Sequence, residues 1–446
     1  MKRNSTRSVR VEAGGNGVVA HVGLHALGSF ADRMGLGDGL SAAIAGRSAR
    51  ARHDRGALLV HTALVLAGGG ESCADIEHLR LGPELFGPVA SNSTLHRVLS
   101  GMGAADRRSI ADAVAQVRRQ VWARSATTTS NGPVYLDIDS SLVEIHSENK
   151  EGTGPTYKGG FGFHPMLCFA DATGEALSGL LRPGSAGANT VADQVAVLDA
   201  AVEQLPAEVQ AGHRDGDDSA EVGHRVVVRT DSAGSTAGFM AALSARNMGS
   251  FTVARSNDEV QAAIFDAIGI EGIWSPVLAR DGSEREDAVV AELTSLVEMP
   301  SFPAGTRFIV RREPLHPGAQ RSLFPSLEHR YFGFYTSKEG SPAVLDAVMR
   351  CERAGQHHAV VAVRPGRRPA DRDAETVQIL GDGWRRAVDL PTNVGGQGTR
   401  SSQRRATPTR PRCRRALNVT TILLVAKHLL SSYSYCRQGG HSAYDL

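Results

Sequence analysis

The sequence lacks the features that stabilise secreted proteins or anchor chains in membranes. Its five cysteines are scattered, and no two of them have a Cys-x-x-Cys spacing. This pattern predicts neither a disulfide framework nor a zinc site, and we expect a reducing cytoplasm. No apolar segment follows the basic residues at the start, so no signal peptide is predicted. The apolar run 420–430 is too short to span a bilayer and contains Lys427 and His428, so we expect no membrane partner.

Net charge is also low, but it is unevenly distributed. The formal net charge is +2, yet residues 351–446 contain 16 Lys and Arg against 7 Asp and Glu. This last stretch is rich in Arg, Pro and Gly and has no sustained helical or strand period. A chain of 446 residues is long enough for two or three structural units. We therefore treat 351–446 as a divergent basic tail.

A strand with two acids on one face lies in the middle of the sequence. Apolar and polar residues alternate from Val134 to His146, so Asp137 and Asp139 point to one face of the predicted strand. Charged side chains are rarely buried unless they are paired or bind a metal. The strand is therefore either an exposed edge or an ion-binding strand.

A second strand ends in another acid. The Val-rich run that starts at Arg225 reads as a strand buried in the middle of a sheet, and Asp231 stands at its carboxyl end. Ligands in such sheets bind at the carboxyl ends of strands. Asp139 and Asp231 could therefore share a divalent cation with hard oxygen ligands, or hold two cations for phosphoryl transfer.

The order of the predicted elements defines a fold class. We expect three strands, a helix, a strand, a helix and a strand, in the order βββαβαβ, at 134–146, 162–170, 176–181, 191–205, 225–231, 235–246 and 250–254. This is an α/β fold with a ribonuclease-H-like mixed sheet, which we place at 134–254.

The region before this core is predicted to be helical. A flexible basic arm, 1–17, precedes a helical region, 18–125, and a polar linker follows it. Basic residues at Arg107, Arg108, Arg118, Arg119 and Arg124 suggest that the region binds DNA, but no helix-turn-helix spacing is present. An ordinary helical subdomain explains the pattern equally well.

Several motifs together resemble a known family. Residues 134 to about 349 resemble the DDE transposase domain of a bacterial insertion-sequence family. The matching segments are Leu136-Asp-Ile-Asp-Ser-Ser141, His146-Ser-Glu-Asn-Lys-Glu-Gly152, Tyr157-Lys-Gly-Gly-Phe-Gly-Phe-His-Pro165, Arg182-Pro-Gly184, Arg229-Thr-Asp-Ser232 and Arg311-Arg-Glu-Pro314. Asp54-Arg-Gly56 and Pro83-Glu-Leu-Phe-Gly-Pro88 in the helical region also resemble that family.

The resemblance implies a transposase that cleaves DNA and transfers strands at the terminal inverted repeats of an insertion sequence. Its partners would be those repeats and target DNA, bound by a homodimer on paired ends in the bacterial nucleoid, and its cofactor Mg²⁺ or Mn²⁺. Asp139 and Asp231 would be the first two catalytic and metal-binding acids, and Asp137 is a secondary metal candidate. Cations near the DNA phosphates would be Lys150, Lys158, Arg182 and Arg229, and the two lysines read equally well as solvated surface cations.

The pattern breaks where the third acid is expected. The resemblance implies a β-rich insertion at 255–335 and then a helix that bears a catalytic Glu; residues 336–350 begin that helix, but the similarity stops after Cys351. One interpretation is a shift of reading frame near codon 350, which would give an inactive product. The other is a genuine DNA-binding tail, with the third acid among Glu352, Asp371, Asp373 and Glu375. Three functions stay open: a transposase, a non-catalytic DNA-binding remnant, and a ribonuclease-H-like nuclease without strand transfer.

Overall fold

The computed structural model describes most of the chain up to residue 353. The described residues are 22–44, 52–70, 72–124, 132–145, 152–222, 226–279, 281–315 and 329–353. The predicted basic arm, Lys150 and the tail beyond residue 353 lie outside them. None of the helices in these ranges combines the length and the apolar character needed to cross a membrane.

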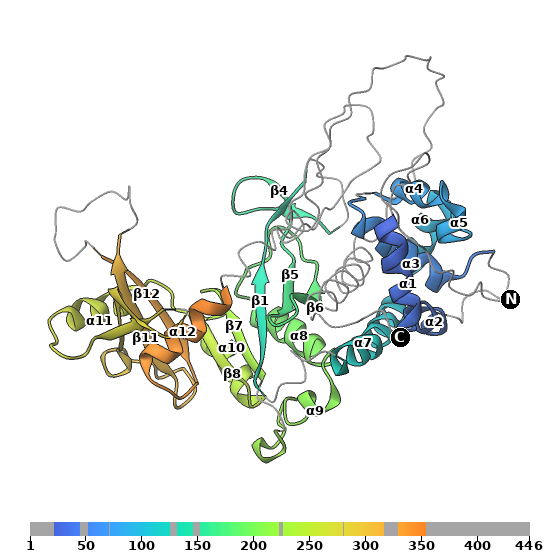
Figure 1. The fold of residues 1–446 in the computed structure, drawn as a ribbon. Helices are drawn as coiled ribbons and strands as arrows, with labels where there is room; N and C mark the ends of the chain where they lie inside the picture. Colours follow the sequence, from blue (N-terminus) through green and yellow to red (C-terminus); the bar gives the residue numbers. More distant parts are fainter. Residues whose placement is uncertain are drawn as a thin grey trace.

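The N-terminal part is built from helices around one apolar core (Figure 1). In chain order these are α1 (Val22–Arg33), α2 (Leu36–Ala43), α3 (Arg55–Ala67), the short η2 (Cys73–Ile76), α4 (Glu77–Arg80), α5 (Pro83–Phe86), α6 (Asn92–Gly101) and α7 (Ala104–Ala123). Helix α3 has apolar residues on almost every side and is buried along most of its length. It therefore forms the centre of the helical part.

The start of α3 shows why the sequence Asp54-Arg-Gly56 is needed there. The Asp54 side chain accepts a hydrogen bond from the Ala57 backbone N–H at 2.7 Å and caps the helix. A Cβ at Gly56 would lie 2.3 Å from the backbone nitrogen of Ser41 in α2. The absence of a side chain at residue 56 thus allows α2 and α3 to pack closely.

A nine-stranded mixed sheet follows. Its strands in chain order are β1 (Val134–Ser140), β5 (Met166–Ala170), β6 (Glu175–Leu180), β7 (Val226–Thr230), β8 (Gly249–Val253), β9 (Ser275–Leu278), β10 (Glu284–Glu292), β11 (Arg307–Pro314) and β12 (His329–Thr336). Their spatial order is β6-β5-β1-β7-β8-β12-β11-β10-β9. Strands β1, β7 and β8 are parallel, whereas β5 and β6 run antiparallel to their neighbours. The predicted ribonuclease-H-like order βββαβαβ is confirmed.

Helices cover the two faces of this sheet differently. On one face, α8 (Val191–Val202) and α10 (Ala237–Ala245) pack with Leu136 and Val228 in a large core. On the opposite face, Leu345 and Met349 of α12 (Pro342–Arg353) pack with Val227 of β7. Tyr135 packs against this second core, so by strand alternation Asp137 and Asp139 point to the face that carries α12.

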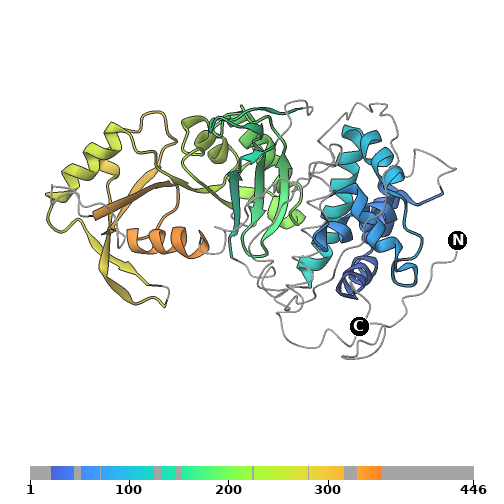
Figure 2. The ribbon, with the colours of Figure 1, turned by 90° about the horizontal axis from the view of Figure 1, so that it is seen from above.

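The β-rich insertion extends the central sheet. Strand β12 pairs antiparallel with β8, and β11, β10 and β9 continue outward from it. Seen from above, the central strands lie between the N-terminal helices and these insertion strands with α11 (Asp258–Ile268) (Figure 2). A small second sheet of β2 (Val143–Glu144), β4 (Phe161–Phe163) and β3 (Gly154–Pro155) follows the carboxyl end of β1, and the short α9 (Ala207–Gln210) precedes β7.

Candidate active site

The two predicted catalytic acids come together at the carboxyl ends of neighbouring strands. Strands β1 and β7 pair in parallel, and their last paired residues are Ile138 and Thr230. The next residue on each strand is an acid, so Asp139 lies level with Asp231. Neighbouring strands lie about 4.8 Å apart, so the two carboxylates can reach a common ligand. Both acids are exposed to solvent.

Local backbone contacts orient each acid. One Asp139 oxygen accepts a hydrogen bond from the Ser140 backbone N–H at 2.7 Å, and one Asp231 oxygen accepts from the Ala233 N–H at 2.9 Å. The turn after Asp231 is very tight, because a Cβ at Gly234 would lie 2.0 Å from the Thr230 hydroxyl oxygen. A glycine at this position therefore allows the turn that places Asp231 at the strand end.

The chemistry of this acid pair fits a divalent cation. Carboxylate oxygens are the hard ligands that Mg²⁺ and Mn²⁺ prefer. Within the described residues, however, no group of three or more His, Cys, Asp or Glu side chains could hold a metal. Asp346 of α12 does not complete the set, because it is fully buried and pairs with Arg311 and Arg350. The other candidates for the third acid lie outside the part of the chain that the structure describes: the side chain of Glu352 and the residues Asp371, Asp373 and Glu375.

Asp137, the secondary metal candidate, has a different environment from Asp139. It is 6% exposed, and its two oxygens accept hydrogen bonds from the Arg229 guanidinium at 2.7 and 2.8 Å. Arg229 also pairs with Asp171 at 2.8 Å and lies over the ring of Tyr135. This geometry makes Asp137 part of a buried ion cluster behind the acid pair and does not support a metal-binding role.

The negative charge of Asp137 also affects a neighbouring thiol. Burial raises the pKa of Cys168 on β5 well above its ordinary value, and the nearby Asp137 carboxylate raises it further. A thiol with a raised pKa stays protonated and is a poor nucleophile or metal ligand. Cys168 is therefore a packing residue of the sheet.

The predicted phosphate contacts of Arg182 and Arg229 need correction. Arg229 is 2% exposed inside the ion cluster, and Arg182 is buried and bonds to Asp193, Ser140 and the carbonyls of His164 and Gly187. Both side chains therefore hold protein segments together and cannot face DNA in this structure. Lys158 is exposed beside Tyr157 near the end of a hairpin, where its ammonium lies 5.8 Å from the ring centroid.

A cation that the sequence did not single out lies next to Asp231. Arg255 follows β8, is exposed, and donates from Nε to the carbonyl oxygen of Ser232 at 2.9 Å. In the sequence it is one arginine after a short strand, and only the parallel pairing of β7 with β8 brings it to the acid pair. It is better placed than Arg182 or Arg229 to contact a phosphate there.

The sequence suggested that the basic residues of α7 belong to a DNA-binding region, but one of them is buried. Arg118 is 1% exposed, pairs with Glu175 of β6 at 2.7 Å and donates to Gln204 at 2.6 Å. Burial lowers the pKa of Arg118 and the charge of Glu175 opposes this shift. Arg118 therefore attaches α7 to the sheet and is no part of a DNA-binding surface.

Comparisons with known proteins identify a family for this chain. The family model described as Transposase DDE domain group 1 matches residues 1–328. No curated protein matches the sequence. Among solved structures, the chain is similar to the piggyBac transposase in a cryo-EM structure of its synaptic complex with hairpin DNA, with 10% identity and a TM-score of 0.30. That match covers 73% of this chain and 62% of the piggyBac chain, so the chain spans less than two thirds of that protein. Because the family model matches well over half of its residues, the chain belongs to the DDE transposase family.

Proposed function

We propose that this transposase cleaves DNA and transfers strands at the terminal inverted repeats of an insertion sequence. The observation that carries the proposal is the register of β1 and β7, which brings Asp139 level with Asp231 at the exposed carboxyl edge of the sheet. Membership of the chain in the DDE transposase family supports a chemical role for these acids, because the family takes its name from its catalytic acids. Bound Mg²⁺ or Mn²⁺ would polarise the phosphodiester and favour attack by water or a 3′-hydroxyl.

The side chains around the pair have separate tasks in this proposal. Asp139 and Asp231 hold the cation, and their backbone hydrogen bonds limit the movement of both carboxylates. Arg255 and Lys158 contact phosphates of the bound strand, because both are exposed cations. The ion pair of Asp137 with Arg229 joins β1 to β7 and does not contact DNA.

The first test removes the acids one at a time. We expect Asp139→Asn and Asp231→Asn each to reduce Mg²⁺-dependent nicking of a plasmid carrying the element's ends by roughly 100-fold or more, since a cation ligand supplies several kcal/mol to the transition state. Asp281→Asn is the matched control, because it removes one exposed carboxylate from the turn between β9 and β10. Unchanged nicking in either site variant would contradict the proposal.

A change of metal separates ligation from a structural effect. Asp139→Cys should be inactive with Mg²⁺ and should regain part of its nicking activity with Mn²⁺, because a thiolate binds the softer Mn²⁺ better than Mg²⁺. A carboxylate that only shapes the strand end would show no such dependence on the metal.

A non-catalytic DNA-binding remnant is the second candidate. It is favoured by the observation that no third acid joins Asp139 and Asp231 within the described residues. Such a protein would bind DNA equally well with and without Mg²⁺ and would never nick it. Sequencing the encoding DNA from codon 335 onward would show its origin: a Glu-bearing helix in another frame indicates a remnant, whereas a single open frame indicates a genuine tail.

A further inference from the structure

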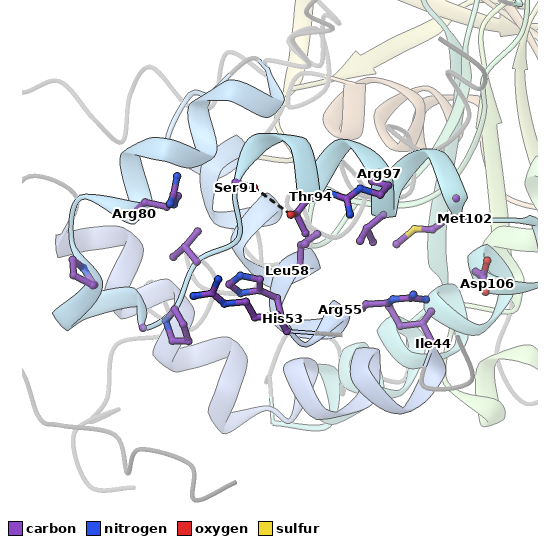
Figure 3. Close-up of a pocket in the computed structure, with 17 residues that line it drawn as sticks. Ile44, His53, Arg55, Leu58, Arg80, Ser91, Thr94, Arg97, Met102 and Asp106 are labelled. Atoms are coloured by element: carbon purple, nitrogen blue, oxygen red, sulfur yellow. Dashed lines mark hydrogen bonds between the residues drawn. The ribbon is translucent and has the colours of Figure 1, made fainter. Parts of the chain in front are cut away.

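A large hollow lies among the N-terminal helices, away from the acid pair. Its volume is about 1230 Å³, and its described lining comes from residues 44–106. Figure 3 shows Arg55, on α3, on one side of this hollow and Arg97, on α6, on the other. Small-molecule pockets have volumes of about 300–1,000 Å³, so the space suits a larger ligand.

The lining of this hollow is strongly basic. We call Arg52, Arg55, Arg80 and Arg97 the groove arginines. Three of them, Arg52, Arg55 and Arg97, form no ion pair or side-chain hydrogen bond with any described residue, whereas Arg80 pairs with Glu77. Arginines without a carboxylate partner are available to an anion.

The acids near the groove do not cancel this charge. Asp106 is the one carboxylate among the described lining residues, and it accepts from the Gly103 backbone N–H at the start of α7. Asp54 stands between Arg52 and Arg55 in the sequence and caps α3 through Ala57, and Glu77 pairs with Arg80. Against these two acids and Asp106, the four groove arginines leave a local balance of one positive charge.

The start of α6 adds hydrogen-bond donors to the same wall. Ser91 stands at the N-cap position of this ten-residue helix, yet its side chain makes no capping bond and its hydroxyl instead approaches that of Thr94 at 3.2 Å (Figure 3). The Asn92 backbone N–H at this helix end already donates to the Glu77 carboxylate at 3.4 Å, so the donors that α6 offers to an anionic ligand are the hydroxyls of Ser91 and Thr94. Together with arginines on two sides, this arrangement fits the spaced phosphates of a nucleic acid.

We propose that the groove lined by Arg52, Arg55, Arg80 and Arg97 binds the phosphate backbone of duplex DNA. DNA is the expected occupant because it is the substrate in the proposed function, on which this inference rests. The chain's own tail fits poorly, since residues 351–446 carry an excess of Lys and Arg and would be repelled. The groove is a binding site separate from the acid pair, and so its contribution can be measured without catalysis.

The test measures DNA binding by fluorescence anisotropy in EDTA, with a labelled duplex of mixed sequence and the full chain. In the groove variant, Arg52, Arg55 and Arg97 are all changed to Gln. We expect affinity to fall roughly five- to tenfold per arginine at about 0.1 M salt, and the slope of log K against log salt to flatten by about 0.9 for each lost phosphate contact.

Two further variants make the result specific. Changing Arg33, Arg214 and Arg330 to Gln removes the same charge from exposed positions outside the groove lining, and should reduce affinity much less. Changing the three groove positions to Lys keeps the charge and should preserve most of the affinity and the salt slope. Thermal melting of each variant checks that it is folded.

The possible outcomes separate this inference from the proposed function. Equal losses in the groove and control variants, or normal binding by the Gln variant, would overturn the groove as a DNA site, whatever the nicking assay gives. A selective loss of binding in the groove variant supports the site even if the wild-type chain never nicks DNA. In that case the groove stands and the proposed catalytic function fails.

Discussion

At the scale of single residues, two acids on the same face of one strand have different surroundings. Asp137 is nearly buried and meets Arg229 through two short hydrogen bonds, whereas Asp139, one pleat further on, is exposed at the strand end. A buried carboxylate whose oxygens already accept from a guanidinium would have to give up that pair to bind a metal. The geometry therefore gives Asp137 a structural role, and of the two acids only Asp139 is exposed as the proposed function requires.

This difference predicts that the same substitution affects stability strongly at Asp137 and hardly at Asp139. Asp137→Asn leaves the Arg229 charge buried against Asp171 alone, and we expect it to reduce the free energy of unfolding by about 3–5 kcal/mol, as removal of one partner from a buried pair does. Asp139→Asn changes an exposed side chain and should alter stability by no more than about 0.5 kcal/mol. Urea denaturation followed by circular dichroism measures both. Similar midpoints for the two variants would show that the ion cluster does not stabilise the sheet.

The sequence predicted the positions of the two exposed acids in the fold better than the surroundings of the cations. Asp139 and Asp231 could be predicted because each stands where a recognisable strand ends, and parallel strand ends meet at one edge. Arg229 was expected to lie near the DNA phosphates because the family resemblance implied it. Its true partner, Asp137, lies 92 positions away in the sequence, and only the register of β1 and β7 reveals the pair. The hollow lined by Arg52 and Arg97 could not be predicted for the same reason, because these distant residues line one space only after folding.

At the scale of elements, close helix packing in the N-terminal part depends on one glycine. Gly56 lies in the first turn of α3, where a Cβ would be 2.3 Å from the Ser41 backbone nitrogen and 2.7 Å from the Gly37 carbonyl oxygen. Backbone atoms cannot move aside as a flexible side chain can. Arg55, the residue before Gly56, lines the groove, so the packing of α2 on α3 also affects the proposed DNA-binding groove.

We expect Gly56→Ala to destabilise the protein by about 1–3 kcal/mol, because the added methyl group must push α2 away from α3. Gly23→Ala is a matched control within α1, where an added Cβ meets no atom within 4 Å. That substitution should be neutral or stabilising by up to about 1 kcal/mol through helix propensity. Thermal melting compares the two variants, and a Gly56→Ala protein as stable as wild type would mean that the helices pack less closely than described.

Elements of the sheet could be predicted well because their patterns are local. The Val run of β7 indicated a central strand, and every residue of that strand is buried. The extension of the sheet by β12 could not be read in this way, because its pairing with β8 depends on contacts across the whole insertion. The same holds for helix α12. Its helical period, with Leu345 and Met349 on the buried side, could be predicted, but its buried ion pair between Asp346 and Arg311 could not, because Arg311 lies on β11.

At the scale of the whole molecule, α7 joins the helical part to the sheet. Its first half contributes Ile110 and Val114 to the N-terminal core, and Trp122 near its end belongs to the large core of the sheet. Between them, Arg118 pairs with Glu175, which also accepts a hydrogen bond from the indole N–H of Trp122 at 3.0 Å. One helix thus sets the position of the basic groove relative to the acid pair.

Glu175→Gln tests this junction. Gln keeps an oxygen for Trp122 but leaves the charge of Arg118, which is 1% exposed, without its carboxylate, so we expect a loss of about 3–5 kcal/mol. Because the weakened contact lies between two cores, scanning calorimetry should show the melting transition at lower temperature and split into two. Glu286→Gln, an exposed change on β10, should melt like wild type.

The same variant shows whether the junction matters for function. Residues of the groove lie on the helical side of α7, so Glu175→Gln should bind duplex DNA in EDTA with wild-type affinity at a temperature where it is folded. If the proposed groove and acid pair act on one DNA molecule, nicking should slow, because their relative position is less fixed. Normal nicking together with the lower melting temperature would contradict this coupling and would limit Arg118 and Glu175 to a role in stability.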